Sequence, residues 1–445
     1  MSSIRVVILD HNGGDRTVRA VESACGASWS GRREVVLVDN ASSVSVLDEV
    51  ARRFPAVTCV RSDVNRGFAG GCNLGIGDPR DVELVALVNN DVVLDPDCLR
   101  RLAAALDADD RVGAAMPKVL LQGDFVRVRL TAPRTTLRHD RRAVSVRLHD
   151  AAVDGDRRRL RLRSGFFGPE ESGRLGPFQW VADEAELYAP VASGRDRLQL
   201  TLSAPTPLVV RIDAGGEPCE LPVGTMPTQL EVALDGPHVH LVNSTGVELT
   251  ADGHGRDRGW LDEDDGRWDA APDPAAWSGA TVVLRAAALT EVGLFDDELF
   301  LYYEDLELGW RGARAGWEVA YVPAAVAWHE HSATAIEGST LAAYHIERNR
   351  LLVLVRHAPL AFATRAVGRF LLSSLSYARR DVLGPALRGE RPSLTVLGAR
   401  LRSFGGFVRM LPGAVRRRRH DRAAFGPARL LGAARPSASG PRSLR

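Results

Sequence analysis

Two adjacent carboxylates, Glu304 and Asp305, lie within an apolar and aromatic run, FLYYEDLELGW, at residues 300–310. Burying ionised carboxylates beside aromatic rings is costly unless they are paired, bound to a ligand or used in catalysis. The same pattern is also typical of a helix start. Acidic side chains favour the positive N-terminal end, and Leu306 and Trp310, four residues apart, can face a core. The run alone leaves a catalytic pair and a structural helix start open.

A second group of residues has the side-chain types that hold a divalent metal. Asn90 and Asp91 follow the apolar run at 84–88, and His329 follows another apolar run farther along the chain. Mg²⁺ and Mn²⁺ prefer oxygen ligands and bridge phosphates, and a histidine nitrogen can complete such a site. Taken singly, an Asn-Asp turn and a structural histidine explain these residues as well.

Two further stretches suit the binding of a nucleotide. Asp39 ends the run EVVLVD, where a carboxylate can accept hydrogen bonds from a base or ribose, or can cap a helix. The stretch NRGFAGGCN at 65–73 has small residues that allow close backbone approach, and its Arg66 offers a diphosphate several donors. The spacing is not GxGxxG, so a dinucleotide-binding fold is not indicated.

The elements that position these residues alternate between short apolar strands and helices over residues 4–120. This pattern predicts an α/β fold with a parallel sheet and helices on both faces, and ligands bind outside the carboxyl ends of such strands. The expected strands are 4–9, 35–38, 57–60 and 84–88. The expected helices are 17–27, 46–54, 69–76 and 96–106.

From about residue 125 the pattern changes to apolar and polar residues in strict alternation, as in VRVRL, LQLTL and LVVRI. This alternation predicts an inserted antiparallel β-sandwich. Helices at 286–292 and 305–315 and a strand at 318–322 are expected after it. The predicted domains are 1–124, 125–250 (β-sandwich), 251–340, 341–420 (amphipathic helices) and 421–445 (a disordered basic tail). The Arg run at 416–420 is also expected to be disordered.

Charge and cysteine usage limit the partners and the compartment. From Arg356 to the end there are 19 arginines and three acidic residues, so the tail should meet an anionic partner. No aromatic-interleaved basic sheet or groove-binding helix accompanies it, which disfavours nucleic acid. Its amphipathic helices predict peripheral contact with an anionic membrane, while packing against the body stays open. The five cysteines are scattered and lack the spacing of metal ligands. The sequence shows neither a signal peptide nor an apolar run long enough to span a membrane, and so we predict a cytoplasmic protein.

Five blocks, taken in their order along the chain, resemble the family-2 glycosyltransferases. They are VVILDHN, VDNAS, NRGFAGGCN, LVNNDVVLDPD and the stretch from Trp277 through WHEHSAT. These are inverting enzymes of the GT-A fold, and the blocks are most similar to the rhamnosyl- and galactofuranosyl-transferase branch. The resemblance covers about residues 4–121 and 255–350. The β-sandwich looks like modules inserted in actinobacterial relatives.

The resemblance implies a role for each matching residue. Asp305 is expected to be the general base with Glu304 beside it, and Asp91 with His329 is expected to hold Mg²⁺ or Mn²⁺. The triplet Asn89-Asn90-Asp91 departs from the family's Asp-x-Asp motif, because only its last carboxylate is kept. The nucleotide-sugar is expected along Asn12, Asp39, Arg66, Gly67, Asn73 and Asn90, and the acceptor near Trp277, Ser278 and Gly279.

The predicted function is inverting transfer of a sugar from a nucleotide-sugar donor to a hydroxyl of a cell-envelope polysaccharide or lipid-linked glycan. The predicted location is the inner face of the cell membrane. A sugar-phosphate nucleotidyltransferase would need a basic activating signature in the first loop, and DHNGGD contains no lysine. A catalytically degenerate transferase that acts as a glycan-binding or scaffold protein is the alternative.

Overall fold

The computed structural model describes residues 2–137, 140–156, 160–172, 175–192, 196–331, 340–389 and 391–425. They form two compact units, each with its own core. Unit 1 comprises residues up to 120, residues 243–260 and the described residues from 266 onward. Unit 2 comprises residues 121–242 and 261–265.

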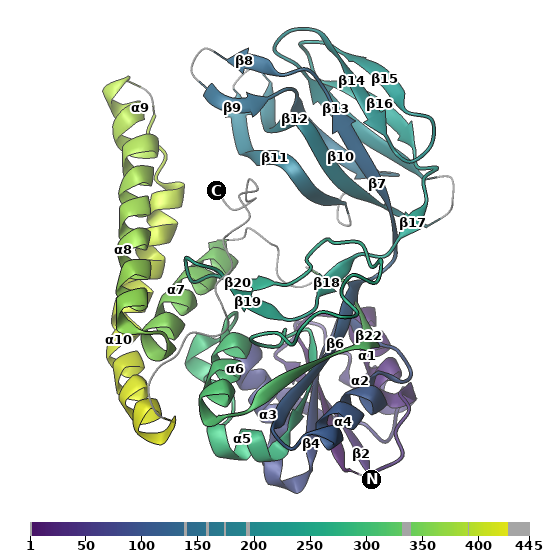
Figure 1. Ribbon diagram of the computed structural model, residues 1–445, viewed down its shortest axis with the longest axis vertical. Coiled ribbons are helices and arrows are strands. Elements are labelled where there is room, and N and C mark those ends of the chain that lie inside the picture. The colour runs from purple at the N-terminus through teal and green to yellow at the C-terminus, as the bar shows by residue number, and fades with distance from the viewer. Residues whose placement is uncertain are drawn as a thin grey trace. The chain divides into compact units, whose positions relative to one another are not determined.

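The sheet of unit 1 follows the order β3-β2-β1-β4-β21-β6-β22-β5. Figure 1 labels β2, β4, β6 and β22 of this sheet. Strands β1 to β4 are parallel, as predicted. However, β21 runs antiparallel to β4 and β6, and β22 runs antiparallel to β5, so the sheet is mixed. The start of an antiparallel strand lies at the carboxyl edge of its parallel neighbours, and β21 and its preceding loop therefore enter the expected ligand edge. The strands are β1 (Ile4–Asp10), β2 (Arg33–Asn40), β3 (Thr58–Ser62), β4 (Leu84–Asn89), β5 (Val92–Leu94), β6 (Val112–Leu121), β21 (Thr281–Arg285) and β22 (Glu318–His329).

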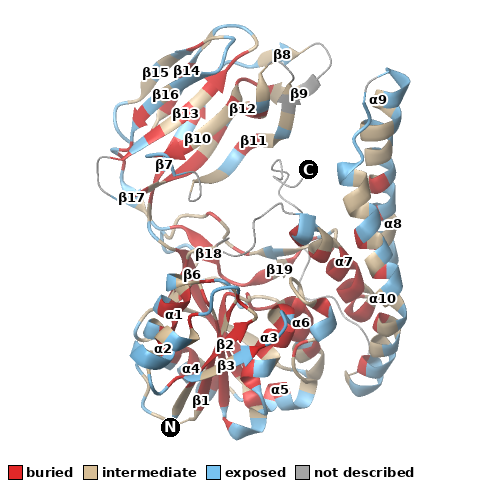
Figure 2. Ribbon diagram, turned by 180° about the vertical axis from the view of Figure 1, so that it is seen from behind, coloured by how far each residue is buried: buried red, intermediate tan, exposed pale blue. Residues whose placement is uncertain are grey.

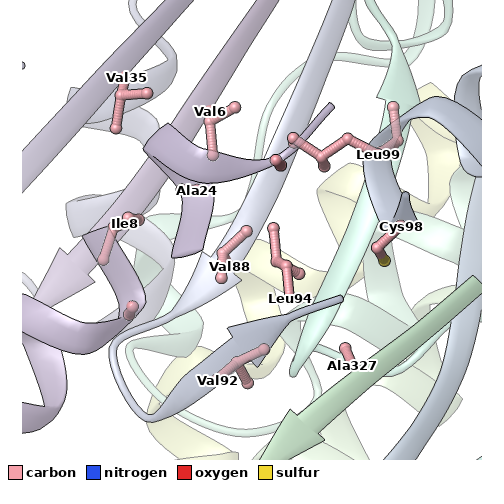
Figure 3. Close-up of a cluster of buried hydrophobic side chains, with 14 of the residues drawn as sticks. Val6, Ile8, Ala24, Val35, Val88, Val92, Leu94, Cys98, Leu99 and Ala327 are labelled. Carbon is pink, nitrogen blue, oxygen red and sulfur yellow. The ribbon is translucent and has the colours of Figure 1, made fainter. Parts of the chain in front are cut away.

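Helices cover both faces of this sheet, which confirms the predicted fold class. Successive side chains of β1 point to opposite faces, so Val6 and Ile8 enter one core and Val7 enters the other. Figure 3 shows the first core, in which Val88 and Ala327 from the sheet meet helical side chains such as Leu99. Its helices are α1 (Asp15–Gly26), α2 (Leu47–Arg53) and α4 (Cys98–Ala108), and the opposite face carries α3 (Gly67–Ile76), α5 (Ala286–Val292) and α6 (Glu304–Ala315).

Unit 2 is antiparallel, as its alternating sequence predicts, but its main strands hydrogen-bond into one sheet rather than two. The path runs β15-β14-β7-β12-β10-β13-β16, and strands from both ends of it contribute to the same core. The sheet therefore curls around that core. Its strands are β7 (Asp124–Thr131), β10 (Arg147–Val153), β11 (Arg161–Ser172), β12 (Gly176–Val191), β13 (Arg197–Ser203), β14 (Leu208–Asp213), β15 (Cys219–Val223), β16 (Thr228–Ala233) and β17 (His238–Val239), beside the pair β8 (Thr135–Leu137) and β9 (Asp140–Val144).

The end of the insertion differs from the predicted boundary at residue 250. Residues 243–260 belong to unit 1. The reason is packing, because Val247 and Leu249 share a buried cluster with Leu306 and Trp310 of α6. This segment contains the end of β18 (Val242–Ser244) and the hairpin of β19 (Val247–Leu249) and β20 (Gly255–Asp257).

The C-terminal region is helical, as predicted, and its helices differ in burial. Helix α7 is largely buried, whereas α8 and α9 expose many residues (Figure 2). The Arg run at 416–420 is part of α10, so the expectation of disorder there is wrong; residues 426–445 lie outside the described residues. No helix in the described part of the chain is long and apolar enough to span a membrane. The helices are α7 (Thr340–His357), α8 (Leu360–Tyr377), a π-helical turn (Ala378–Leu383), α9 (Gly384–Leu387) and α10 (Thr395–Phe425).

Candidate active site

The carboxyl ends of the parallel strands share one buried carboxylate, Asp10. One of its oxygens accepts hydrogen bonds from Gly13 N, Thr17 Oγ1 and Asn90 Nδ2, and the other accepts one from Ser42 Oγ. Asp10 therefore fixes the loops that follow β1, β2 and β4 relative to one another. Sequence reasoning placed Asp10 at a strand end but did not select it. The selected residue, Asn90, is buried and supports this network.

Asp39 lies at the end of β2 with a fully buried side chain. Its Oδ1 accepts a hydrogen bond from Ser42 N, and its Oδ2 pairs with Arg61 at 2.9 Å. Burial opposes ionisation, but hydrogen bonds from Ser45 and Ser42 and the charge of Arg61 hold the pKa of Asp39 below its usual value. Arg61 is the half-exposed partner, so a base could reach the Asp39 carboxylate only if Arg61 moved aside.

The amide of Asn40, which sequence reasoning did not select, holds the glycine-rich stretch. It donates to Asn65 Oδ1 and to the Gly67 carbonyl, and it accepts from the Arg66 backbone N–H. Gly67 has φ +69°, and a Cβ there would lie 2.2 Å from the Phe300 carbonyl oxygen. Only glycine fits this approach. The Arg66 side chain remains exposed at the start of α3.

Three other predicted residues are found in different settings. Asn12 is exposed, and its Oδ1 accepts from both the N–H and the hydroxyl of Ser43. Asn73 bonds with its amide to Phe295 and Asp297, and so it joins α3 to the segment before α6. Trp277 is only 2% exposed and packs edge-on against Phe295 in the core. Trp277 is therefore a core side chain in this structure, and its expected place near the acceptor stays a prediction.

The sheet register brings the two predicted metal ligands together. His329 pairs with Val92 across β22 and β5, which places it beside Asp91. The His329 Nε2 atom lies 3.1 Å from Asp91 Oδ1, and Nδ1 lies 2.6 Å from Asn243 Oδ1. Burial opposes ionisation of Asp91, but the charge and hydrogen bond of His329, with a contribution from His331, lower the pKa of Asp91.

This pair fits a divalent metal. When His329 is neutral with its proton on Nδ1, that proton is donated to Asn243 Oδ1, and the Nε2 lone pair is available to a metal beside Asp91. Two ligand atoms held at right angles around one Mg²⁺ are about 3 Å apart, close to the distance between Nε2 and the Asp91 oxygen. Within the described residues, no group of three or more His, Cys, Asp or Glu side chains is arranged as a complete metal site. A metal here would need further ligands from a substrate or from water.

The carboxyl group of Asp305 is oriented by two backbone donors at the start of α6. Its Oδ2 accepts from Gly279 N at 2.9 Å, and its Oδ1 accepts from Leu306 N at 2.7 Å. A Cβ on Gly279 would lie 3.3 Å from Oδ2, so glycine allows this close approach. The structure thereby brings together Asp305 and Gly279, two residues predicted from distant parts of the sequence.

Glu304 and Asp305 are neighbours with different surroundings. Asp305 is half-buried, whereas Glu304 is 5% exposed and its Oε2 has no hydrogen-bond partner among the described residues. Burial, followed by the charge of Asp305, raises the pKa of Glu304. Burial also raises the pKa of Asp305, and the charge of Asp257 adds to this while the N–H groups of Leu306 and Gly279 oppose it.

Helix α7 holds the turn that leads into this pair. Phe300, Tyr302 and Tyr303 all have positive φ, a conformation that is costly for side chains of this size. The Asn349 amide donates to the carbonyls of Leu299, Leu301 and Tyr302. Sequence reasoning missed Asn349, although the polar run ERNR within an apolar helical stretch was a visible signal.

Asp257, on β20, was also missed. Burial raises its pKa, which hydrogen bonds from two serines and the charge of His329 oppose, and the charge of Asp257 adds to the raised pKa of Asp305. These hydrogen bonds reach Asp257 from Ser244 and from the predicted residue Ser278. Ser278 adjoins Gly279, which donates to Asp305, and Ser244 adjoins Asn243, which contacts His329. These segments bring Asp305 and the Asp91–His329 pair into the same region as Asp257. Such a site can remove a proton at one end and bind an anion through a metal at the other.

Two family models match the chain. The one described as "Glycosyl transferase family 2" matches residues 5–160, and the one described as "Glycosyltransferase like family 2" matches residues 270–352. N-acetylglucosaminyl-diphospho-decaprenol L-rhamnosyltransferase of Mycobacterium tuberculosis (strain ATCC 25618 / H37Rv) is 36% identical over 130 residues, 26% of this chain and 42% of the relative. Succinoglycan biosynthesis protein ExoO of Rhizobium meliloti (strain 1021) is 37% identical over 106 residues, 24% of this chain and 30% of the relative.

These alignments span less than half of each relative's length. Among solved structures, GalNAc-T7 with UDP, GalNAc and Mn²⁺ has a TM-score of 0.44 at 13% identity, and the match covers 80% of this chain and 48% of that one. The two family models describe glycosyltransferases of one family, and they match the stretches that carry Asp91, the Glu304–Asp305 pair and His329. The chain belongs to the family-2 glycosyltransferases.

Proposed function

We propose that the protein is an inverting, metal-dependent glycosyltransferase. It moves a sugar from a nucleoside-diphosphate-sugar to a hydroxyl of a cell-envelope polysaccharide or a lipid-linked glycan. The observation that carries this proposal is the oriented carboxylate of Asp305, which accepts from Gly279, together with the Asp91–His329 pair, which Asn243 holds.

Asp305 is the proposed general base. Inversion at the anomeric carbon requires the acceptor hydroxyl to attack from the face opposite the leaving diphosphate. Gly279 N and Leu306 N fix the carboxylate, and burial raises its pKa toward that of an effective base at neutral pH. Its carboxylate takes the proton of the hydroxyl as the new glycosidic bond forms. Glu304, with its pKa raised further, stays neutral beside it and so leaves Asp305 as the only charge of the two.

Asp91 and His329 are the proposed ligands of Mg²⁺ or Mn²⁺, which would neutralise the charge that develops on the diphosphate. Asn243 holds the His329 ring so that Nε2 faces the carboxylate. The nucleotide is proposed to lie along the strand ends, beside exposed Asn12 and Arg66. In this arrangement Asp39 positions Arg61 at the edge where the base would bind.

Contact with the membrane is part of the proposal, because a lipid-linked acceptor lies at a bilayer surface. Leucines of α8, the π-helical turn and α9 form an exposed leucine face. Its members are Leu371, Leu372, Leu375, Leu383 and Leu387, the last of which is 88% exposed. On α8, Arg365 and Arg369 are exposed one turn apart, and neither forms an ion pair within the described residues. Apolar side chains bordered by cations are typical of a helix in the interface of an anionic bilayer.

A donor screen tests the reaction. The full chain is mixed with UDP-, dTDP- and GDP-linked hexoses and deoxyhexoses in Mn²⁺, Mg²⁺ or EDTA, and released nucleoside diphosphate is measured. We expect metal-dependent turnover of one donor, with loss of turnover in Asp91→Ala. Failure of the chain to bind any of these donors, with or without metal, would contradict the proposal and support a degenerate scaffold.

Vesicle sedimentation tests the membrane contact. The chain should sediment with phosphatidylglycerol-containing vesicles but not with phosphatidylcholine vesicles, and the double variant Leu372→Ser/Leu375→Ser should sediment less. Val44→Ser is the matched control, because Val44 is an equally exposed apolar residue far from the leucine face in the sequence. Equal sedimentation of the leucine variant and the control would exclude this face as the binding surface.

A further inference from the structure

Asp257 ends the short strand β20, and several contacts fix its position. β20 pairs with β19, so that Asp257 lies opposite Val247. Two residues earlier, the Gly255 N–H donates to the Tyr303 hydroxyl at 3.0 Å, which ties β20 to the residue immediately before Glu304. The carboxyl group of Asp257 is therefore held on a fixed backbone beside the catalytic turn.

One oxygen of this carboxyl group has no partner. Hydrogen bonds from Ser244 and Ser278 reach the side chain, but Oδ1 is buried without a hydrogen-bond partner within the described parts of the chain. The two neighbouring arginines do not neutralise it. Arg256 pairs with Glu248, and Arg258 donates to the carbonyls of Thr245 and Pro272. A buried acceptor left unpaired is costly, and such an atom calls for an explanation in a bound ligand or an ordered water.

The surroundings of Asp257 indicate which ligand this is. The two serines that reach Asp257 adjoin the residues that hold the two ends of the site. Ser244 follows Asn243, whose Oδ1 lies 2.6 Å from His329 Nδ1. Ser278 precedes Gly279, whose N–H donates to Asp305. The acceptor hydroxyl must meet Asp305, and the diphosphate must meet the metal held by Asp91 and His329. The sugar in transit is bonded to the diphosphate and is attacked by that hydroxyl, so it must lie between these two ends. Its ring hydroxyls are hydrogen-bond donors, and a carboxylate oxygen is a strong acceptor for them.

We propose that Asp257 Oδ1 accepts a hydrogen bond from a ring hydroxyl of the transferred sugar, and that it selects donors in which this hydroxyl is present. Ser244 and Ser278 hold the other side of the carboxyl group and so fix the direction of Oδ1. The inference rests on the proposed glycosyl transfer and adds to it a specificity-determining residue. A polar site that is built for a substrate hydroxyl rejects an analogue without it far more strongly than an apolar site rejects a small change in size.

The test measures discrimination between donors. The donor that the screen identifies is compared with its analogues that lack one ring hydroxyl at a time, on the wild type, Asp257→Ala, Asp257→Asn and the control Glu248→Gln. The control removes a carboxylate from β19, the partner strand, where Glu248 pairs with Arg256. A deoxy donor differs from its parent in intrinsic reactivity, but this difference is the same for all four proteins. Comparing the parent-to-deoxy ratio of kcat/KM among the proteins therefore isolates the contact with residue 257.

For one deoxy position, the wild type should prefer the parent donor at least about a hundredfold, and Asp257→Ala should lose most of that preference. The other deoxy positions should be discriminated equally by both proteins, and Glu248→Gln should match the wild type throughout. Affinity for the metal-loaded nucleoside diphosphate, which carries no sugar, should be unchanged in Asp257→Ala and Asp257→Asn. This binding also confirms that both variants are folded.

Two results would overturn the inference, and they are distinguishable. If the wild type turns over a donor but Asp257→Ala keeps the same ratio at every ring position, Asp257 does not contact the sugar, and the oxygen is paired by water. If the wild type binds and turns over no donor, the proposed function fails and the inference fails with it.

Discussion

At the scale of single residues, the two neighbouring carboxyl groups of the site have separate environments. Asp305 is half-buried and receives two backbone N–H groups, whereas Glu304 is buried with one oxygen unpaired. Hydrogen bonds to a carboxylate favour its charged form, and burial without them favours the neutral form. The structure thus separates a carboxylate that can accept a proton from one that keeps its own.

The pH dependence of the rate should reflect the raised pKa of Asp305. Transfer needs the ionised form, so kcat/KM should fall as the pH falls through a midpoint above the usual aspartate value of about 3.9. The profile is measured at two saturating metal concentrations, because a limb caused by the metal ligands would shift with metal whereas that of Asp305 would not. A metal-independent midpoint in the usual aspartate range would contradict this assignment.

Glu304→Gln should stabilise the fold at neutral and alkaline pH. Burial raises the pKa of Glu304, so the folded chain holds a proton that the unfolded chain has lost. Stability is therefore fully present below the unfolded pKa of about 4.3 and decreases until the pH passes the raised folded pKa. Glutamine removes this contribution. The difference in melting temperature between variant and wild type should grow with pH over that window, and a constant difference would disprove it.

Sequence reasoning selected candidate residues by side-chain type and local motif. Asp91, Asp305 and His329 follow apolar runs or lie within one, and the structure places His329 within 3.1 Å of Asp91. Their roles stay predictions. Asp10 and Asp257 were missed because their importance comes from partners far away in the chain. The burial of Trp277 was not predicted, because an aromatic residue beside a Ser-Gly pair gives no sign of whether it faces the core or a ligand.

At the scale of elements, helix α6, which begins with Glu304 and Asp305, is held by the helices that follow it. Glu307 of α6 is fully buried with Arg311, Arg356 and His357 around it. Burial opposes its ionisation, but the charges of Arg311 and Arg356 and the hydrogen bond of His357 lower the pKa of Glu307 well below its usual value. These contacts tie α7 to α6.

Asn349→Ala should loosen the turn before α6. Three carbonyls would lose a donor while three residues stay at positive φ, so unfolding should require about 1–3 kcal/mol less. We also expect kcat to fall more than donor affinity, because Asn349 holds the carbonyls that lead into Asp305, whereas the Phe300 carbonyl that faces Gly67 is not among its partners. Denaturant unfolding and kinetics check this. Leu341→Ala, an exposed change on the same helix, is the control, and equal effects of the two variants would refute the clamp.

The elements that the sequence predicted best are those set by local periodicity. The four parallel strands and their helices were expected nearly where they occur. The antiparallel entry of β21 was not predicted, because strand direction in a sheet depends on distant partners. The helix at the Arg run 416–420 was not predicted either, because it also depends on partners that are distant in the sequence. Arg417 there pairs with Asp296 and Glu298, and Arg418 donates to carbonyls at the end of α7.

At the scale of the whole molecule, the chain forms a second unit as an insertion in the first. It leaves unit 1 at residue 120 and returns at residue 243, and within unit 2 the Leu121 N–H donates to the Leu241 carbonyl. The entry and exit strands are therefore adjacent. The change to period-two alternation revealed the insertion, whereas its exit was misjudged because residues 243–260 pack into unit 1.

Replacing residues 122–240 with a short glycine-containing linker should leave unit 1 folded. The ends to be joined are already hydrogen-bonded neighbours, and the cores of unit 1 contain no side chain from the removed segment. Circular dichroism and metal-dependent binding of nucleoside diphosphate check the result. An unfolded product, or loss of nucleotide binding in a folded one, would show that the insertion is needed by the site.

The account as a whole depends on Asp305 as the base. The most direct test is the turnover of the identified donor by wild type and Asp305→Asn, measured beside donor affinity in the same metal-containing buffer. We predict that turnover falls by about 10²–10⁴-fold while the donor dissociation constant is unchanged, because asparagine keeps the shape but cannot accept the proton. Equal turnover by the two proteins, with donor bound by both, would contradict the account.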